Sequence, residues 1–143
     1  MTEVFVDTAY LVALLNPHDD LHLRAVELRA MLETCRLITS DLILGELLTY
    51  FGDVGNPEER SYFRKQAVEI TRELLCAPEV IVESQTHDLF DAALSFYADR
   101  PDKGYSYVDC SSMVVMKRRG ILEVATADHH FAQEGFLILL PRR

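Results

Sequence analysis

The sequence predicts an α/β fold of three layers, in which helices cover both faces of a central, mostly parallel sheet of about five strands. Short apolar runs rich in β-branched residues alternate with segments whose apolar residues recur at helical spacing. Parallel strands need such crossover helices, and strands covered on both faces have continuous apolar runs. With 143 residues, 49% hydrophobic and 26% charged, the chain is expected to form one domain over residues 1–143.

The elements follow one another along the chain with clear start and stop signals. Asn16-Pro17 ends the first helix, Ser40 or Asp41 caps the third, and Gly120 ends the helix that precedes the fourth strand. The expected strands are residues 4–6, 37–39, 80–82, 124–126 and 136–140. The expected helices are residues 8–16, 20–32, 41–51, 58–75, 86–97, 106–119 and 128–133, with a loop over 99–105.

Composition narrows the class of protein. No apolar run approaches the roughly 20 residues of a membrane span, and the N-terminus lacks the pattern of a secretory signal, so a cytoplasmic protein is expected. Cys35, Cys76 and Cys110 are odd in number and far apart, and we interpret them as reduced core residues. The net charge of −9 argues against nucleic-acid binding, although several carboxylates gathered in a cation site would account for part of it.

Acidic residues follow the predicted strands. Asp7 comes directly after the first strand, and Asp128 lies two residues beyond the strand of residues 124–126. Asp41 lies at the same sheet edge, and Asp109 lies in the first turn of a helix expected to begin there. Ligand sites of parallel sheets lie beyond the carboxyl ends of the strands, so these acids are expected at one rim.

Glu46 is a further candidate because of its helical neighbours. Leu42, Ile43 and Tyr50 are apolar or aromatic, which predicts that the Glu46 side chain shares an apolar ridge. A carboxylate held against a core needs a partner, and no lysine or arginine occurs between Arg36 and Arg60. Converging carboxylates favour Mg²⁺ or Mn²⁺, which can activate water against a phosphodiester.

Each aspartate also has a purely structural explanation. Asp7 and Asp128 can cap the helices that follow them, and Ser106 with Asp109 fits a capping box. The adjacent His129 and His130 diverge on a helix and do not match a two-histidine metal motif. Basic residues at 117–119 and along residues 60–72 are interpreted first as solvated faces, and second as phosphate contacts.

Four segments resemble the motifs of PIN-domain ribonucleases, and within that family the VapC-like toxins of type II toxin-antitoxin systems. They are Val6-Asp7-Thr8 with residues 11–16, Leu44-Gly45-Glu46-Leu47-Leu48, Ser106-Tyr107-Val108-Asp109, and Thr126-Ala127-Asp128-His129-His130-Phe131. The segments occur in order over the whole chain, which makes the set more specific than any one member.

This resemblance implies a PIN-like fold, metal-dependent cleavage of RNA with Mg²⁺ or Mn²⁺, an antitoxin partner and a homodimer. It implies catalytic and metal-binding roles for Asp7, Glu46, Asp109 and Asp128, with Asp7 and Asp109 as metal ligands, Asp128 as a ligand or water contact, and Glu46 as a ligand through water or an orienter of the nucleophile. Thr8 and Thr126 would hold these acids or contact phosphate.

Other functions fit less well. A haloacid-type phosphohydrolase needs a second aspartate two residues after the first, where this chain has Ala9. A receiver domain needs a lysine after its last strand, where this chain has Leu139-Leu140-Pro141. A PIN-like domain that binds RNA or a protein without cutting is the remaining alternative.

Overall fold

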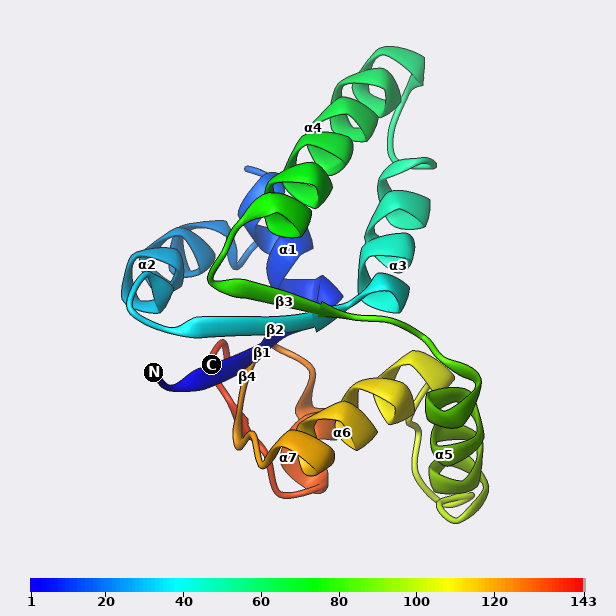
Figure 1. Cartoon of the computed structure of the whole chain (residues 1–143). Helices are drawn as coiled ribbons and strands as arrows, with labels where there is room; N and C mark the ends of the chain where they lie inside the picture. The colour runs from blue at the N-terminus through cyan, green and yellow to red at the C-terminus, as the bar shows by residue number, and fades with distance from the viewer. Residues whose placement is uncertain (143) are drawn as a thin grey trace.

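The five strands form one parallel sheet. A computed structural model describes residues 1–142 (Figure 1). Its strands are β1 (Glu3–Val6), β2 (Arg36–Ser40), β3 (Val80–Glu83), β4 (Glu123–Ala125) and β5 (Leu137–Ile138). Their order across the sheet is β3-β2-β1-β4-β5, and every neighbouring pair is parallel. The predicted fold class is therefore confirmed.

Helices cover both faces of the sheet. Those of the first half of the chain are α1 (Thr8–Leu15), α2 (His22–Leu32), α3 (Asp41–Phe51) and α4 (Pro57–Cys76). Those of the second half are α5 (His87–Ala98), α6 (Tyr107–Arg119) and α7 (His129–Gln133). The first group lies above the sheet in Figure 1 and the second group below it. The core is formed where both layers pack on the sheet, with Phe5, Ile38 and Phe131 fully buried.

The strand order creates a switch point between β1 and β4. The chain builds outward from β1 through β2 to β3, and then returns to place β4 on the other side of β1. In register, Val6 of β1 lies beside Ala125 of β4, so Asp7 and Thr126 leave the sheet side by side. The loops that follow two such strands diverge to opposite faces and leave a crevice, where ligands of parallel α/β proteins bind.

Two expectations at the level of elements and burial were wrong. The last strand is shorter than residues 136–140, although Leu139 and Leu140 continue its hydrogen bonds to the residues beside them. The three cysteines are all free, but only Cys110 is fully buried. Cys76 is exposed because α4 ends there, beyond Leu74, the last buried residue of that helix. Within residues 1–142, no helix combines the length and apolarity that crossing a membrane requires.

Candidate active site

A cleft of about 460 Å³ lies at the switch point, and acidic side chains from five segments line it. Asp7 and Thr8 come from the end of β1, Glu46 from α3, Asp109 from α6, and Asp128 and His130 from the start of α7. Asp19 and Arg142 also lie on its wall. The structure thus brings together the four acids that the sequence singles out for chemistry.

Asp7 lies on the floor of the cleft and does not cap a helix. It occupies the N-cap position of α1, but its side chain makes no capping hydrogen bond. Instead, the Thr126 hydroxyl donates to Oδ2 of Asp7 at 2.7 Å. Burial, together with the smaller effect of the Asp109 and Glu46 charges, raises the pKa of Asp7 to about 7, against the hydrogen bond from Thr126. An ionised Asp7 therefore needs a nearby positive charge.

Asp109 is held in place by the capping box that its sequence suggested. The backbone N–H of Ser106 donates to Oδ2 of Asp109 at 3.0 Å, and the backbone N–H of Asp109 donates to the Ser106 hydroxyl oxygen at 3.0 Å. Burial raises the pKa of Asp109, and the charge of Asp128 adds to this effect. The capping and the functional interpretations are therefore compatible, because the cap fixes the carboxylate that faces the cleft.

Asp128 is also both a cap and a wall of the cleft. Its Oδ1 accepts from the backbone N–H of His130 at 2.9 Å and caps α7. The backbone N–H of Asp128 donates to the Thr126 hydroxyl oxygen at 3.1 Å. Because this same hydroxyl donates to Asp7, Thr126 fixes two of the acids at once.

The surroundings of Glu46 and Asp41 in the structure differ from those predicted from their sequence neighbours. Glu46 lies on the exposed side of α3, so the expectation that it is held against an apolar ridge was wrong. Ile43 points into the core, while Tyr50 is 45% exposed beside Glu46 at the mouth of the cleft. The partner of Glu46 is Thr8, whose hydroxyl donates to Oε1. Asp41 accepts from the backbone N–H of Gln85 and, among residues 1–142, is not part of the cleft lining.

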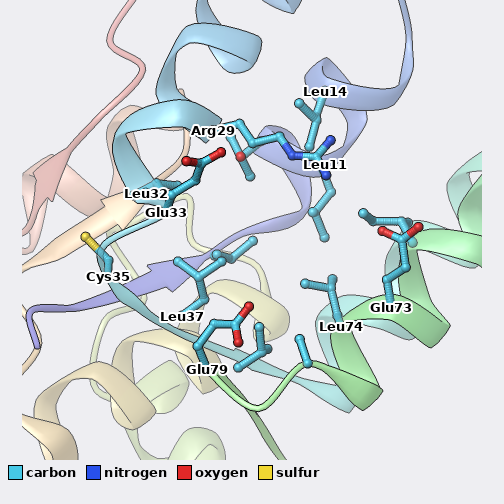
Figure 2. Close-up of a pocket in the computed structure, with 15 residues that line it drawn as sticks. Leu11, Leu14, Arg29, Leu32, Glu33, Cys35, Leu37, Glu73, Leu74 and Glu79 are labelled. Carbon is cyan, nitrogen blue, oxygen red and sulfur yellow. The ribbon is translucent and has the colours of Figure 1, made fainter.

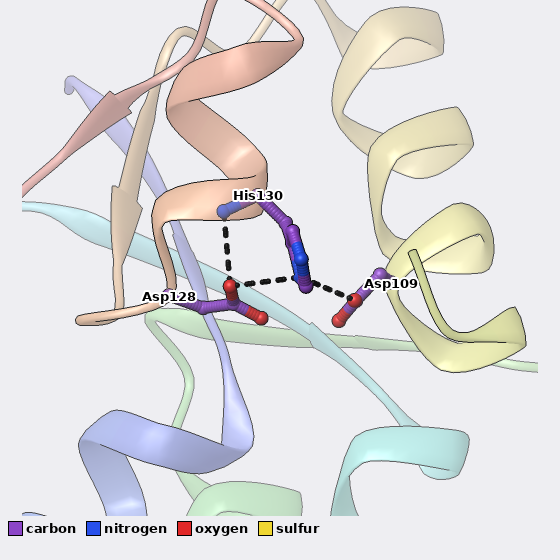
Figure 3. A group of neighbouring side chains, drawn as sticks. All are labelled: Asp109, Asp128 and His130. Carbon is purple, nitrogen blue, oxygen red and sulfur yellow. Dashed lines mark hydrogen bonds and ion pairs between the residues drawn. The ribbon is translucent and has the colours of Figure 1, made fainter. Parts of the chain in front are cut away.

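His130 is a member of the site that the sequence analysis set aside. Its Nδ1 lies 3.1 Å from Oδ1 of Asp128 and 3.7 Å from Oδ2 of Asp109 (Figure 3). The signal was present in the sequence, because a residue two positions after a helix-capping aspartate can turn back toward that cap. Only one of the two adjacent histidines faces the acids, so the spacing of a two-histidine metal motif does not identify it.

The cleft suits a divalent cation. The ligand atoms of Asp109, Asp128 and His130 all lie within 4.8 Å of one another. Nδ1 of His130 is buried without a hydrogen-bond partner, although it lies close to two carboxylates. Within residues 1–142, no lysine or arginine forms an ion pair with any of the cleft acids. Acids so placed repel one another, and a bound cation relieves that repulsion.

Comparison with known proteins identifies the family. The family model of the PIN domain matches residues 4–137. The chain belongs to the PIN-domain family. The 23S rRNA-specific endonuclease VapC20 of Mycobacterium tuberculosis is 31% identical to this PIN domain over 138 residues, which cover 96% of this chain and 98% of VapC20.

Solved structures agree with the family. The crystal structure of M. tuberculosis VapC20, a sarcin-ricin loop cleaving toxin, has a TM-score of 0.80 and 30% identity, covering 94% of this chain and 96% of that one. FitAcB from Neisseria gonorrhoeae has a TM-score of 0.65 at 17% identity, covering 94% and 95% of the two chains, and is similar in fold alone.

The basic residues at positions 117–119 form ion pairs with acidic residues of this PIN domain. Lys117 pairs with Glu134, Arg118 with Asp88, and Arg119 with both Glu3 and Glu83. Their interpretation as a structural helix end therefore accounts for them better than RNA contact does.

A second pocket lies away from the acids, between α1, α2, α4 and the start of β2. Its volume is about 280 Å³, and Leu11, Leu14, Leu32 and Leu74 form much of its wall (Figure 2). Charged groups such as Arg29 and Glu73 stand among these apolar side chains. This mixed lining lacks the convergent carboxylates of the cleft, so the cleft is the candidate for chemistry in this PIN domain.

Proposed function

We propose that this chain is a metal-dependent endoribonuclease and the toxin of a type II toxin-antitoxin pair. The observation that carries the proposal is the cleft at the switch point, where Asp7, Glu46, Asp109 and Asp128 converge without a lysine or arginine paired to them among residues 1–142. Membership of the PIN family and the 31% identity to an endonuclease over nearly the whole chain support the same activity.

The metal site in this proposal consists of the cleft carboxylates. Asp7, Asp109 and Asp128 would hold Mg²⁺ or Mn²⁺, and the bound cation would activate a water and neutralise charge that develops on the scissile phosphate. Thr126 keeps the Asp7 carboxylate oriented, and Ser106 does the same for Asp109. Fixed ligands of this kind lose little entropy when the cation binds.

Glu46 has a different role in this proposal because it lies at the exposed mouth of the cleft. Its Oε1 accepts from Thr8, which leaves Oε2 free to accept a hydrogen bond from the attacking water. Glu46 would thereby orient the water toward the phosphodiester. Arg142 lines the same cleft and offers a cation for the RNA backbone.

The proposal extends to partners and setting. We infer a single PIN domain over residues 1–143, located in the cytoplasm and inhibited by an antitoxin. We also infer a homodimer, which is supported by three side chains spaced along one face of α5: Phe90, Leu94 and Tyr97 are 44–49% exposed. Light scattering on the purified chain tests the dimer, and co-purification with the product of the adjacent gene tests the antitoxin.

Cleavage of RNA by the purified, antitoxin-free chain tests the activity. The substrate is a pool of structured RNA that includes 23S rRNA, incubated with Mn²⁺, Mg²⁺ or a chelator. Cleavage is expected only with metal, and Asp109→Asn is expected to reduce it at least about 100-fold, because a metal ligand is lost. Asp88→Asn, at an exposed acid outside the cleft, is the matched control and should cleave like the wild type.

Failure would also be informative. A folded chain that cuts none of these RNAs with either metal would contradict the nuclease proposal and leave a domain that binds RNA or protein without cutting. Metal-dependent cleavage in vitro without any effect of expression on bacterial growth would contradict the toxin assignment alone.

A further inference from the structure

The imidazole of His130 is held firmly from the side away from the acids. Its ring packs edge-on against Tyr105, with the ring centroids 5.6 Å apart. Tyr105 is itself fixed, because its hydroxyl donates to Glu134 at 3.0 Å. A side chain at Gly104 would place its Cβ 3.1 Å from Nε2 of His130, so the absence of one leaves room for the ring. These contacts point Nδ1 into the cleft.

Nδ1 of His130 lacks the partner that its surroundings demand. It is buried and makes no hydrogen bond of acceptable geometry, although Oδ1 of Asp128 lies 3.1 Å away and Oδ2 of Asp109 3.7 Å away. A buried polar atom without a hydrogen-bond partner costs free energy. Two carboxylate oxygens this close to the ring nitrogen form ion pairs with a protonated imidazole, and a shared cation would hold the same three atoms around a neutral imidazole.

The spacing of the three atoms suits one ion. Adjacent ligands of an octahedral cation with bonds of about 2.1 Å are roughly 3 Å apart. The separations of Nδ1 of His130 from the carboxylate oxygens of Asp128 and Asp109, 3.1 and 3.7 Å, are close to this value. Asp109 lies on α6, and Asp128 and His130 lie at the start of α7. Oδ1 of Asp128 is shared with the backbone N–H of His130, which fixes the carboxylate relative to the ring.

We propose that Nδ1 of His130 is a nitrogen ligand of the divalent cation, together with Asp109 and Asp128, and that it makes the site select Mn²⁺ over Mg²⁺. Mg²⁺ prefers oxygen ligands and gives up water reluctantly, whereas transition-metal ions accept imidazole nitrogen. The inference rests on the metal site of the proposed function, but it does not depend on RNA cleavage.

Pulsed EPR of the Mn²⁺-loaded full chain tests this ligand directly. A coordinated imidazole gives a ¹⁴N modulation, which becomes that of ¹⁵N when the wild-type chain is labelled with ¹⁵N-histidine. The wild type and His129→Asn are expected to show the modulation, because His129 is an exposed neighbour, and His130→Asn is expected to lose it. We expect His130→Asn to weaken Mn²⁺ binding at least about tenfold and Mg²⁺ binding less than about threefold.

The outcomes separate this inference from the nuclease proposal. A wild-type chain that binds Mn²⁺ without a histidine nitrogen signal, or that binds no Mn²⁺, overturns the assignment of His130, as does a signal that persists in His130→Asn. The labelled wild type decides the matter even if His130→Asn does not fold. A nitrogen signal in a chain that cleaves no RNA supports His130 as a ligand while contradicting the nuclease.

Discussion

Glu134 and the buried acids of the cleft lie on either side of Tyr105 and His130, and their pKa values shift in opposite directions. On one side, Glu134 receives hydrogen bonds from Arg100, Lys117 and Tyr105. Burial alone would raise the pKa of Glu134, but these donors outweigh it and lower the pKa to about 2. On the other side, burial and neighbouring acids raise the pKa of Asp7 to about 7.

For these buried acids, the neighbouring partners determine the charge state more than burial does. Glu134 is ionised and satisfied within the protein, so it ties α7 to α6 and to the loop before α6. Asp7 faces other carboxylates, so its ionised form is stable only when a cation comes from outside. Glu134 therefore has a structural role, whereas the acids of the cleft suit a bound cation.

The largest effect on stability is expected from Asp7→Asn, which removes the carboxyl group whose pKa is raised. Between its ordinary value of 3.8 and about 7, folded metal-free protein holds a proton on Asp7 that the unfolded chain has lost. The free energy of unfolding therefore falls as pH rises through this range, by up to about 4 kcal/mol above pH 7. Asp7→Asn should be more stable than the wild type at pH 8, with a smaller gain at pH 5, measured by urea unfolding with chelator.

Added Mn²⁺ provides the control for this experiment. It should stabilise the wild type at pH 8 more than it stabilises Asp7→Asn, because the variant lacks the charge that the cation neutralises. Equal stability of the two proteins at both pH values, without metal, would contradict the raised pKa of Asp7 and its contrast with Glu134.

A smaller effect, in this case a loss of stability, is expected from Glu134→Gln, which removes the charge that Arg100 and Lys117 share. The Glu134 side chain is only 11% exposed, and removing its charge leaves Arg100 without its ion-pair partner. We expect the free energy of unfolding at pH 7 to fall by about 2–3 kcal/mol. Asp88→Asn, which breaks an exposed pair with Arg118, should cost about 0.5 kcal/mol or less, and a similar loss in both variants would show that the Glu134 group is not special.

The smallest effect on stability is expected from Thr8→Val, at the mouth of the cleft. The substitution removes the hydrogen bond to Glu46 but keeps the shape of the side chain, so unfolding should change by less than about 1 kcal/mol. RNA cleavage should fall about 3- to 10-fold through misplacement of Glu46. Thr8→Ser should restore it, and an undiminished effect of Thr8→Val in a Glu46→Gln background would contradict this link.

The sequence was enough to predict those site residues whose positions follow from the order of the strands. Asp7 and Asp128 follow neighbouring parallel strands, so the rule for sheet edges was enough to bring them together. Local spacing could not predict the exposure of Glu46, because Ile43 and Leu47 in the same part of α3 face the core while Glu46 faces the cleft mouth. His130 was missed because its orientation depends on Tyr105 and Gly104, which lie in a loop of no regular pattern.

The position of β4 has a consequence for the growing chain. β1 ends at Val6, but its neighbour on the cleft side is β4, which begins at Glu123. Asp128 and His130 follow β4 still later, so the cleft has its full set of ligands only after residues up to 130 have been made. Synthesis that stops before residue 130 therefore leaves a chain without a complete cleft, however much of the sheet has already formed.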